Sequence, residues 1–250
     1  MGVFVIRLKT LLALALVSVL TALACVGIVK YKQYVSASKN GYVIVIDPGH
    51  GGADGGVLSG TKKVKESEIN LYVSKILANL LSRRGYTVKL TRNADVGLYE
   101  VGASNKKLSD MQKRKQIIND NKPDLVISIH QNHFSSASVR GAHVFYSDKQ
   151  EASERYAQIF QADLNASLGQ NKSHKKADYY VLQCSPYPSL LIECGFLSNP
   201  IDESNLLKPS YREKIAEIIA SSVDNLFFAQ TEAQVGCTKT SNRVELSRLY

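Results

Sequence analysis

The sequence alternates between two kinds of hydrophobic pattern, and this alternation constrains the fold more than any other feature. Short β-branched apolar runs predict buried strands, and longer stretches with apolar residues at helical spacing predict amphipathic helices. The predicted strands are residues 42–47, 86–91, 124–129, 142–147 and 189–194, and the predicted helices are 66–84, 108–121, 151–168 and 210–228. We therefore expect an α/β fold, a single domain over residues 42–229 with a mostly parallel twisted sheet and helices on both faces.

An uncharged hydrophobic run, residues 10–29, precedes this domain and predicts one N-terminal helix. Twenty helical residues span roughly 30 Å, the thickness of a bilayer core. The basic N-terminus, residues 1–9, favours an inside start with the rest of the chain exported. The run is either a signal anchor in contact with the membrane or a signal peptide cleaved after Ala22-Leu23-Ala24. Lipid modification of Cys25 is disfavoured, because Ala22 stands where leucine usually precedes such a cysteine. The chain is expected to be exported, as a membrane-anchored or secreted protein.

The charge of the chain argues against a nucleic-acid partner. The whole sequence carries a net charge of +9, but residues 31–230 carry only +5. No basic stripe is interleaved with aromatic residues, so we expect no nucleic acid to bind. The polar residues 30–41 and 230–250 are interpreted as a linker and a tail. Four cysteines in 250 residues are too few for a disulfide scaffold, and their spacing matches no zinc finger.

Three predicted strands end in side chains that bind metals or transfer protons. His50 follows the first strand, His130 follows the third and Glu193 lies in the last. Because ligands of open α/β sheets bind beyond the carboxyl ends of the strands, these groups are expected to converge at one edge. Two neutral imidazoles and one carboxylate form a catalytic zinc site that leaves a position open for water. Glu66, the first residue of a predicted helix, is the favoured carboxylate and Glu68 its competitor, although a glutamate there also complements the helix dipole.

Glu193 stands in an otherwise apolar strand, where an unpaired carboxylate is costly. This cost favours a functional role over a chance occurrence. A carboxylate that does not bind the metal can accept the proton of a zinc-activated water and return one to a leaving amine. The neighbouring Cys194 points to the opposite face of the strand, so we expect a core thiol rather than a nucleophile.

Other polar residues near these positions have ordinary structural explanations. We expect His133, His143 and His174 to be hydrogen-bonded structural residues. Asp47 either orients a metal ligand or caps the turn before Pro48. The glycine-rich run HGGADGG suits a turn better than a phosphate loop, because no GxGxxG or GK[ST] fingerprint follows it.

Four motifs in order, VIVIDPGHGGADGG, KESEINL, DLVISIHQNH and LLIECGFLSNP, resemble the zinc-dependent N-acetylmuramoyl-L-alanine amidases of the type 3 catalytic domain. The resemblance covers residues 42–229. It implies one Zn²⁺ held by His50, Glu66 and His130, with Glu193 as the catalytic acid/base. It also implies cleavage of the amide between the lactyl group of muramic acid and the L-alanine of the peptidoglycan stem peptide.

The layout of the chain is most similar to the sporulation members of that family. It has one N-terminal hydrophobic segment and one catalytic domain, without wall-binding repeats. The resemblance implies action on spore-cortex peptidoglycan, where removal of stem peptides lets muramic δ-lactam form and marks the cortex for germination enzymes. It also implies a location in the space between the forespore membranes.

The sequence departs from the family pattern after His130, where Gln131, Asn132 and His133 replace the common Asn-Ala pattern. An activating protein partner would act on the loop 131–140. Two alternative functions remain open. The first is a catalytically weak or partner-dependent peptidoglycan-binding module. The second is a zinc carboxypeptidase, which needs a cationic clamp for a terminal carboxylate, with Arg92 and Arg114 as candidates.

Overall fold

A six-stranded sheet forms the centre of the computed structural model, which describes the backbone of residues 8–39 and 41–246. The strand order is β2-β1-β3-β6-β4-β5. The strands are β1 (Val43–Pro48), β2 (Thr87–Leu90), β3 (Leu125–Asn132), β4 (His143–Tyr146), β5 (Lys175–Lys176) and β6 (Ser189–Phe196). All neighbouring pairs are parallel except β4 with β6. The predicted α/β fold with a mostly parallel sheet is confirmed.

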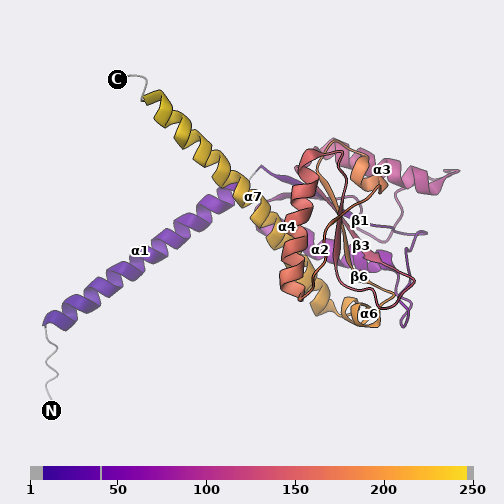
Figure 1. Cartoon of the computed structure of the whole chain (residues 1–250), viewed down its shortest axis with the longest axis horizontal. Helices are drawn as coiled ribbons and strands as arrows, with labels where there is room; N and C mark the ends of the chain where they lie inside the picture. Colours follow the sequence, from indigo (N-terminus) through magenta and orange to yellow (C-terminus); the bar gives the residue numbers. More distant parts are fainter. Residues whose placement is uncertain (1–7, 40, 247–250) are drawn as a thin grey trace, which may run out of the picture.

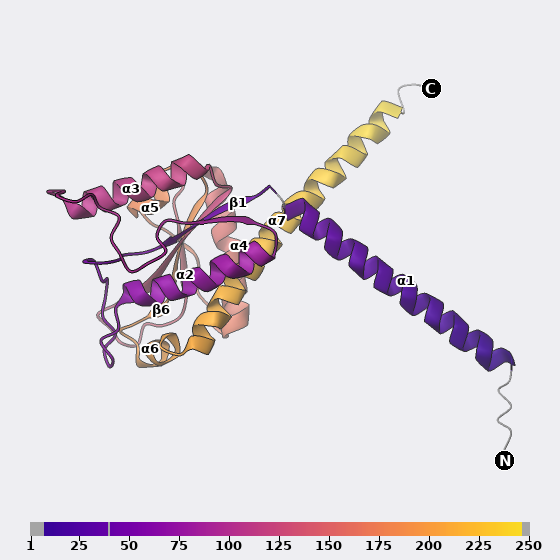
Figure 2. The same cartoon turned by 180° about the vertical axis from the view of Figure 1, so that it is seen from behind.

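Helices cover both faces of this sheet (Figures 1 and 2). The helices are α1 (Leu8–Lys39), α2 (Glu66–Arg83), α3 (Lys106–Asn121), α4 (Glu151–Leu168), α5 (Tyr180–Gln183), α6 (Pro200–Leu206) and α7 (Pro209–Leu246). The larger core cluster joins one face of the sheet to the buried sides of α2, α4 and α7. A smaller cluster joins the other face to α3 and α5. Burial on both faces explains why the central strands are continuous apolar runs rather than alternating ones.

Helix α1 and the C-terminal part of α7 extend away from the α/β domain (Figure 1). Helix α1 is the expected N-terminal hydrophobic helix, and its apolar side chains are exposed, for example Leu14 at 60% and Leu23 at 63%. Within the described residues, no helix combines the length and the apolarity that crossing a membrane requires. Most of the basic N-terminus, residues 1–9, lies outside the described residues.

Helical structure continues into the segments interpreted as a linker and a tail. Helix α1 runs through the linker as far as Lys39, and α7 runs through the tail as far as Leu246. Neither segment contains proline, so nothing interrupts the backbone hydrogen bonding of the helix. Their interpretation as a linker and a tail stays a prediction.

Candidate metal centre

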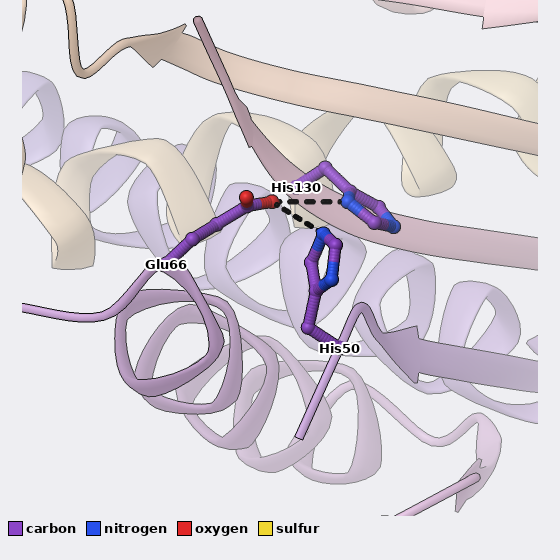
Figure 3. Close-up of side chains that lie close together, drawn as sticks. All are labelled: His50, Glu66 and His130. Atoms are coloured by element: carbon purple, nitrogen blue, oxygen red, sulfur yellow. Dashed lines mark hydrogen bonds and ion pairs between the residues drawn. The ribbon is translucent and has the colours of Figure 1, made fainter. Parts of the chain in front are cut away.

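The strand order brings three distant residues to one edge of the sheet. His50 directly follows β1, His130 lies near the end of β3, and Glu66 is the first residue of α2. Glu66 Oε1 lies 3.3 Å from His50 Nε2 and 3.0 Å from His130 Nδ1. One potential ligand atom from each of the three residues lies within 4.8 Å of the other two, and Figure 3 shows both imidazoles beside the carboxylate. The structure thus brings His50, Glu66 and His130 together, whereas the competitor Glu68 is exposed and outside the cluster.

The Glu66 carboxylate is held in place by donors from three segments. Its Oε1 accepts hydrogen bonds from the backbone N–H of Gln131 at 3.0 Å and from Asn70 Nδ2 at 3.2 Å. Its Oε2 accepts the backbone N–H of Val57 at 3.0 Å. Burial would raise the pKa of Glu66, but the hydrogen bonds and charges of the two histidines outweigh it and lower the pKa below its usual range. Glu66 is therefore a fixed carboxylate, as a metal ligand must be.

Two glycines lie so close to this cluster that a side chain at either position would overlap a candidate ligand. A Cβ on Gly49 would lie 2.2 Å from the His130 ring. A Cβ on Gly56, which has φ +66°, would lie 2.4 Å from Glu66 Oε2. The glycine-rich run between the first strand and α2 is thus a turn that allows the backbone to approach two candidate ligands closely.

His50 has an unusual backbone, with φ +61° in a residue that is not glycine. Buried guanidinium groups hold this turn. Arg114 Nη2 donates to the carbonyl of His50 at 2.6 Å, and Arg92 Nη2 donates to the carbonyl of Gly49 at 2.8 Å. The imidazole is fixed from the other side, because His50 Nδ1 lies 2.8 Å from Asp54 Oδ1. That contact turns Nε2 toward Glu66.

Arg92 and Arg114 are not available as a clamp for a substrate carboxylate. Their exposed fractions are 3% and 2%. Arg114 is paired with Asp47 and with Asp110. Asp47 also accepts hydrogen bonds from the hydroxyls of Thr91 and Ser128. Asp47 therefore acts on the candidate metal ligand through Arg114, which is the orienting role rather than the turn cap.

Glu193 lies beside His130 in the parallel pairing of β3 with β6. Its exposed fraction is 8%, and Oε2 has no hydrogen-bond partner among the described residues. Burial, and then the charge of Glu66, raise the pKa of Glu193 well above its ordinary value. A buried carboxylate that takes up a proton this readily is suited to accept and return one. The adjacent Cys194 is fully buried in the larger core cluster, as expected for a core thiol.

The other histidines lie outside the cluster. His143 donates from Nε2 to the carbonyl of Ser173 at 2.8 Å, which confirms its structural role. His174 faces Glu154 at 4.0 Å, and the side chain of His133 is exposed.

Two residues that position the candidate ligands were not among those predicted from the sequence. Asp54 follows His50 by four residues, and Asn70 follows Glu66 by one helical turn. A search for polar residues near each candidate ligand would have found both, because metal-binding side chains are usually hydrogen-bonded to such partners.

The fold and the candidate metal centre define a class of α/β metallohydrolase. A family model described as Amidase_3, N-acetylmuramoyl-L-alanine amidase, matches residues 44–225. The chain belongs to this family and is a peptidoglycan N-acetylmuramoyl-L-alanine amidase with a His-Glu-His candidate metal site.

Curated relatives and solved structures agree with this assignment. The chain is 35% identical over 193 residues to the germination-specific N-acetylmuramoyl-L-alanine amidase of Bacillus subtilis, covering 75% of this chain and 81% of that protein. It is 33% identical over 190 residues to the probable cell wall amidase LytH of Staphylococcus epidermidis, covering 75% of this chain but only 59% of that protein. The structure of the CwlD amidase from Clostridioides difficile in complex with the GerS lipoprotein matches with a TM-score of 0.71 and 33% identity, covering 75% of this chain and 98% of that one.

Proposed function

We propose that the chain is a zinc hydrolase that cleaves the amide between N-acetylmuramic acid and L-alanine. The cluster of His50, Glu66 and His130 carries this proposal. Two imidazole nitrogens and one carboxylate are a donor set that fits Zn²⁺, and three protein ligands leave a position for water. Bound zinc would polarise the lactyl carbonyl and lower the pKa of its water to about 7.

Glu193 is the proposed acid/base. Its carboxylate would take the proton of the attacking water and return a proton to the alanine amine as the amide breaks. The apolar surroundings that raise its pKa favour the first transfer, because they stabilise the protonated carboxyl that holds the proton until the amine accepts it.

The substitution Glu193→Gln in the full chain separates zinc binding from acid/base catalysis. The variant is expected to bind one equivalent of zinc and to lose at least about a hundredfold in rate, because the general base is gone. Zinc content is measured by elemental mass spectrometry, and cleavage by mass spectrometry of digested peptidoglycan. Glu66→Gln should lose zinc, and the exposed Glu68→Gln should lose neither property. Full activity of Glu193→Gln would exclude the proposed role.

We also propose that the natural substrate is spore-cortex peptidoglycan and that the reaction leads to muramic δ-lactam. The similarity to the germination-specific amidase of Bacillus subtilis supports this role. Muropeptide analysis of cortex from spores that lack the protein should show no δ-lactam, and expression of the wild-type chain should restore it. Normal δ-lactam in those spores would refute the cortex role.

We further propose that the chain is exported and that it has an activating protein partner. The uncharged run 10–29 behind a basic N-terminus supports export, to the membrane surface or to the space between the forespore membranes. The match to CwlD in complex with the GerS lipoprotein supports an activating protein partner. The loop 131–140, with Phe134 exposed at 51%, is the proposed contact. Cell fractionation and co-purification from sporulating cells test both points, with Phe134→Ser expected to weaken partner recovery.

A further inference from the structure

A cavity of about 210 Å³ opens beside the candidate metal centre, where the sheet meets α3 and α5. His50 and His130 line one side of it. Its other side is mostly apolar and is formed by Met111, Tyr179, Tyr180, Val181 and Leu191. We call it the tyrosine cavity. Its position means that a substrate whose scissile carbonyl lies at the metal cluster must place one of its two flanking groups near these side chains.

Two tyrosines in this wall are exposed although they are large and partly apolar. Tyr179 is 43% exposed and Tyr180 is 42% exposed. The Tyr179 ring is fixed edge-on to Phe145, with ring centroids 5.5 Å apart and an interplanar angle of 79°. Phe145 in turn packs against His143, with ring centroids 4.5 Å apart. A held but exposed aromatic ring beside a reaction centre is a surface for a ligand, because its apolar face remains to be covered.

The charges around the cavity distinguish between the two halves of the substrate. Both cations that line it are already paired, Lys107 with Asp54 at 2.8 Å and Arg114 with Asp47 and Asp110. A stem peptide carries free carboxylates, which would meet these acids and find no unpaired cation in the wall. A muramoyl ring is neutral once its lactyl carboxyl is in the amide, and its ring hydrogens form an apolar face.

The lactyl group fixes how far the sugar lies from the reaction. The scissile carbonyl carbon is only three bonds from the ring carbon that carries the lactyl ether. The ring must therefore occupy space directly beside the metal cluster, as the tyrosine cavity does.

We propose that the tyrosine cavity is the muramic-acid subsite, in which Tyr179 and Tyr180 cover the apolar face of the sugar ring. This inference rests on the proposed amidase reaction. The two tyrosines then determine specificity: they select an amide that carries a sugar over the same amide without one. They contribute mainly to substrate binding, since neither is a proton-transfer group in the proposed reaction.

A pair of substrates that differ only in the sugar tests this assignment. The full chain loaded with zinc is assayed on N-acetylmuramoyl-tripeptide and on D-lactoyl-tripeptide, which contain the same amide. Wild-type protein should prefer the sugar-bearing substrate. Tyr179→Ala and Tyr180→Ala should each lower kcat/KM about tenfold on that substrate, mainly through KM, and leave the lactoyl peptide nearly unchanged. Tyr179→Phe should keep most of the preference.

The controls give each outcome one meaning. Tyr72→Ala removes a tyrosine that packs on Arg212, at 4.0 Å, outside this cavity, and should leave both substrates unaffected. Equal losses on both substrates for Tyr179→Ala and Tyr180→Ala would overturn the sugar subsite and indicate a peptide contact or a general structural effect. No loss on either substrate would overturn it as well. Wild-type protein that cleaves neither compound, even with the co-purified partner present, would instead refute the proposed amidase reaction itself.

Discussion

The position of the candidate metal ligand His50 depends on residues that never touch the metal cluster. Its left-handed backbone is unfavourable for a residue with a Cβ, by of order 1–3 kcal/mol. The buried guanidinium of Arg114 offsets this cost by binding the His50 carbonyl and the Asp47 carboxylate together. Such supporting contacts hold an imidazole in one orientation, so their loss weakens metal binding before it destroys the fold.

Replacing Arg114 with lysine should therefore reduce zinc affinity. The lysine keeps the positive charge but lacks the planar fork that reaches Asp47, Asp110 and the His50 carbonyl together. We expect a loss of about 10- to 100-fold in zinc affinity, measured by competition with a coloured chelator. The exposed Arg155→Lys serves as the control. Wild-type zinc affinity in Arg114→Lys would show that the turn keeps His50 in place without the guanidinium of Arg114.

A second residue-level prediction concerns His143 and acid. Burial lowers the pKa of His143 to about 4, from 6.5. Between these values the unfolded chain binds more protons than the folded one, so the free energy of unfolding falls as the pH falls. The loss from this group is about 2 kcal/mol at pH 5. Denaturant unfolding from pH 7 to pH 4 should show it, and His143→Gln should flatten that part of the profile. The exposed His133→Gln should not.

The sequence predicted the chemistry-bearing residues but not the contacts that position them. His50, His130 and Glu193 were predictable because each follows or ends a recognisable apolar strand, and strand ends share an edge. The contacts of Arg114 were not, because they join β1 to a helix more than sixty residues away. Only the folded backbone determines whether such a guanidinium faces solvent, a substrate or a buried carbonyl.

At the level of elements, the turn between β1 and α2 determines whether the metal cluster can assemble. The first residue of α2 provides the carboxylate, and the turn before it passes within contact distance of the His130 ring. Local sequence therefore provides two candidate ligands, and the pairing of β1 with β3 brings the third to them.

Gly49→Ala tests how tightly the turn is packed. The added methyl group would overlap the His130 ring, so either the ring or the backbone must move. We expect zinc binding to be lost and the free energy of unfolding to fall by about 1–3 kcal/mol. Zinc titration and thermal unfolding measure the two effects. Gly60→Ala is the matched control, because its Cβ would be at ordinary contact distance, 3.6 Å from Glu203. Identical behaviour of the two variants would contradict the packing argument.

The hydrophobic pattern predicted most elements between the two terminal helices closely and the smallest ones not at all. The helix expected over 66–84 is α2, Glu66–Arg83, and the strand expected over 42–47 is β1, Val43–Pro48. Strand β5 and helix α5 have two and four residues, too few for any periodicity to register. The antiparallel direction of β4 depends on which neighbour it pairs with, and residue patterns within the strand do not encode that.

For the whole molecule, metal binding and folding should be linked. The cluster joins residues 50, 66 and 130, which an unfolded chain does not hold together. Zinc should therefore stabilise the folded state, by about 2.7 kcal/mol when free zinc is a hundred times its dissociation constant. Thermal unfolding with and without a chelator should reveal a higher Tm for the loaded protein, and His50→Ala should abolish the difference. An unchanged Tm in the wild-type chain would mean that zinc does not bind this cluster.

Both outer strands of the sheet also influence how copies of the protein meet one another. Strand β5 consists of two exposed lysines, and the opposite outer strand, β2, has four residues and includes Lys89. Short, lysine-bearing edges are poor templates for strand addition by a second chain, because pairing would bury charge and gain few hydrogen bonds. The sheet is thereby protected against edge-to-edge aggregation, so the folded domain can accumulate to high local concentration without forming β-linked fibres.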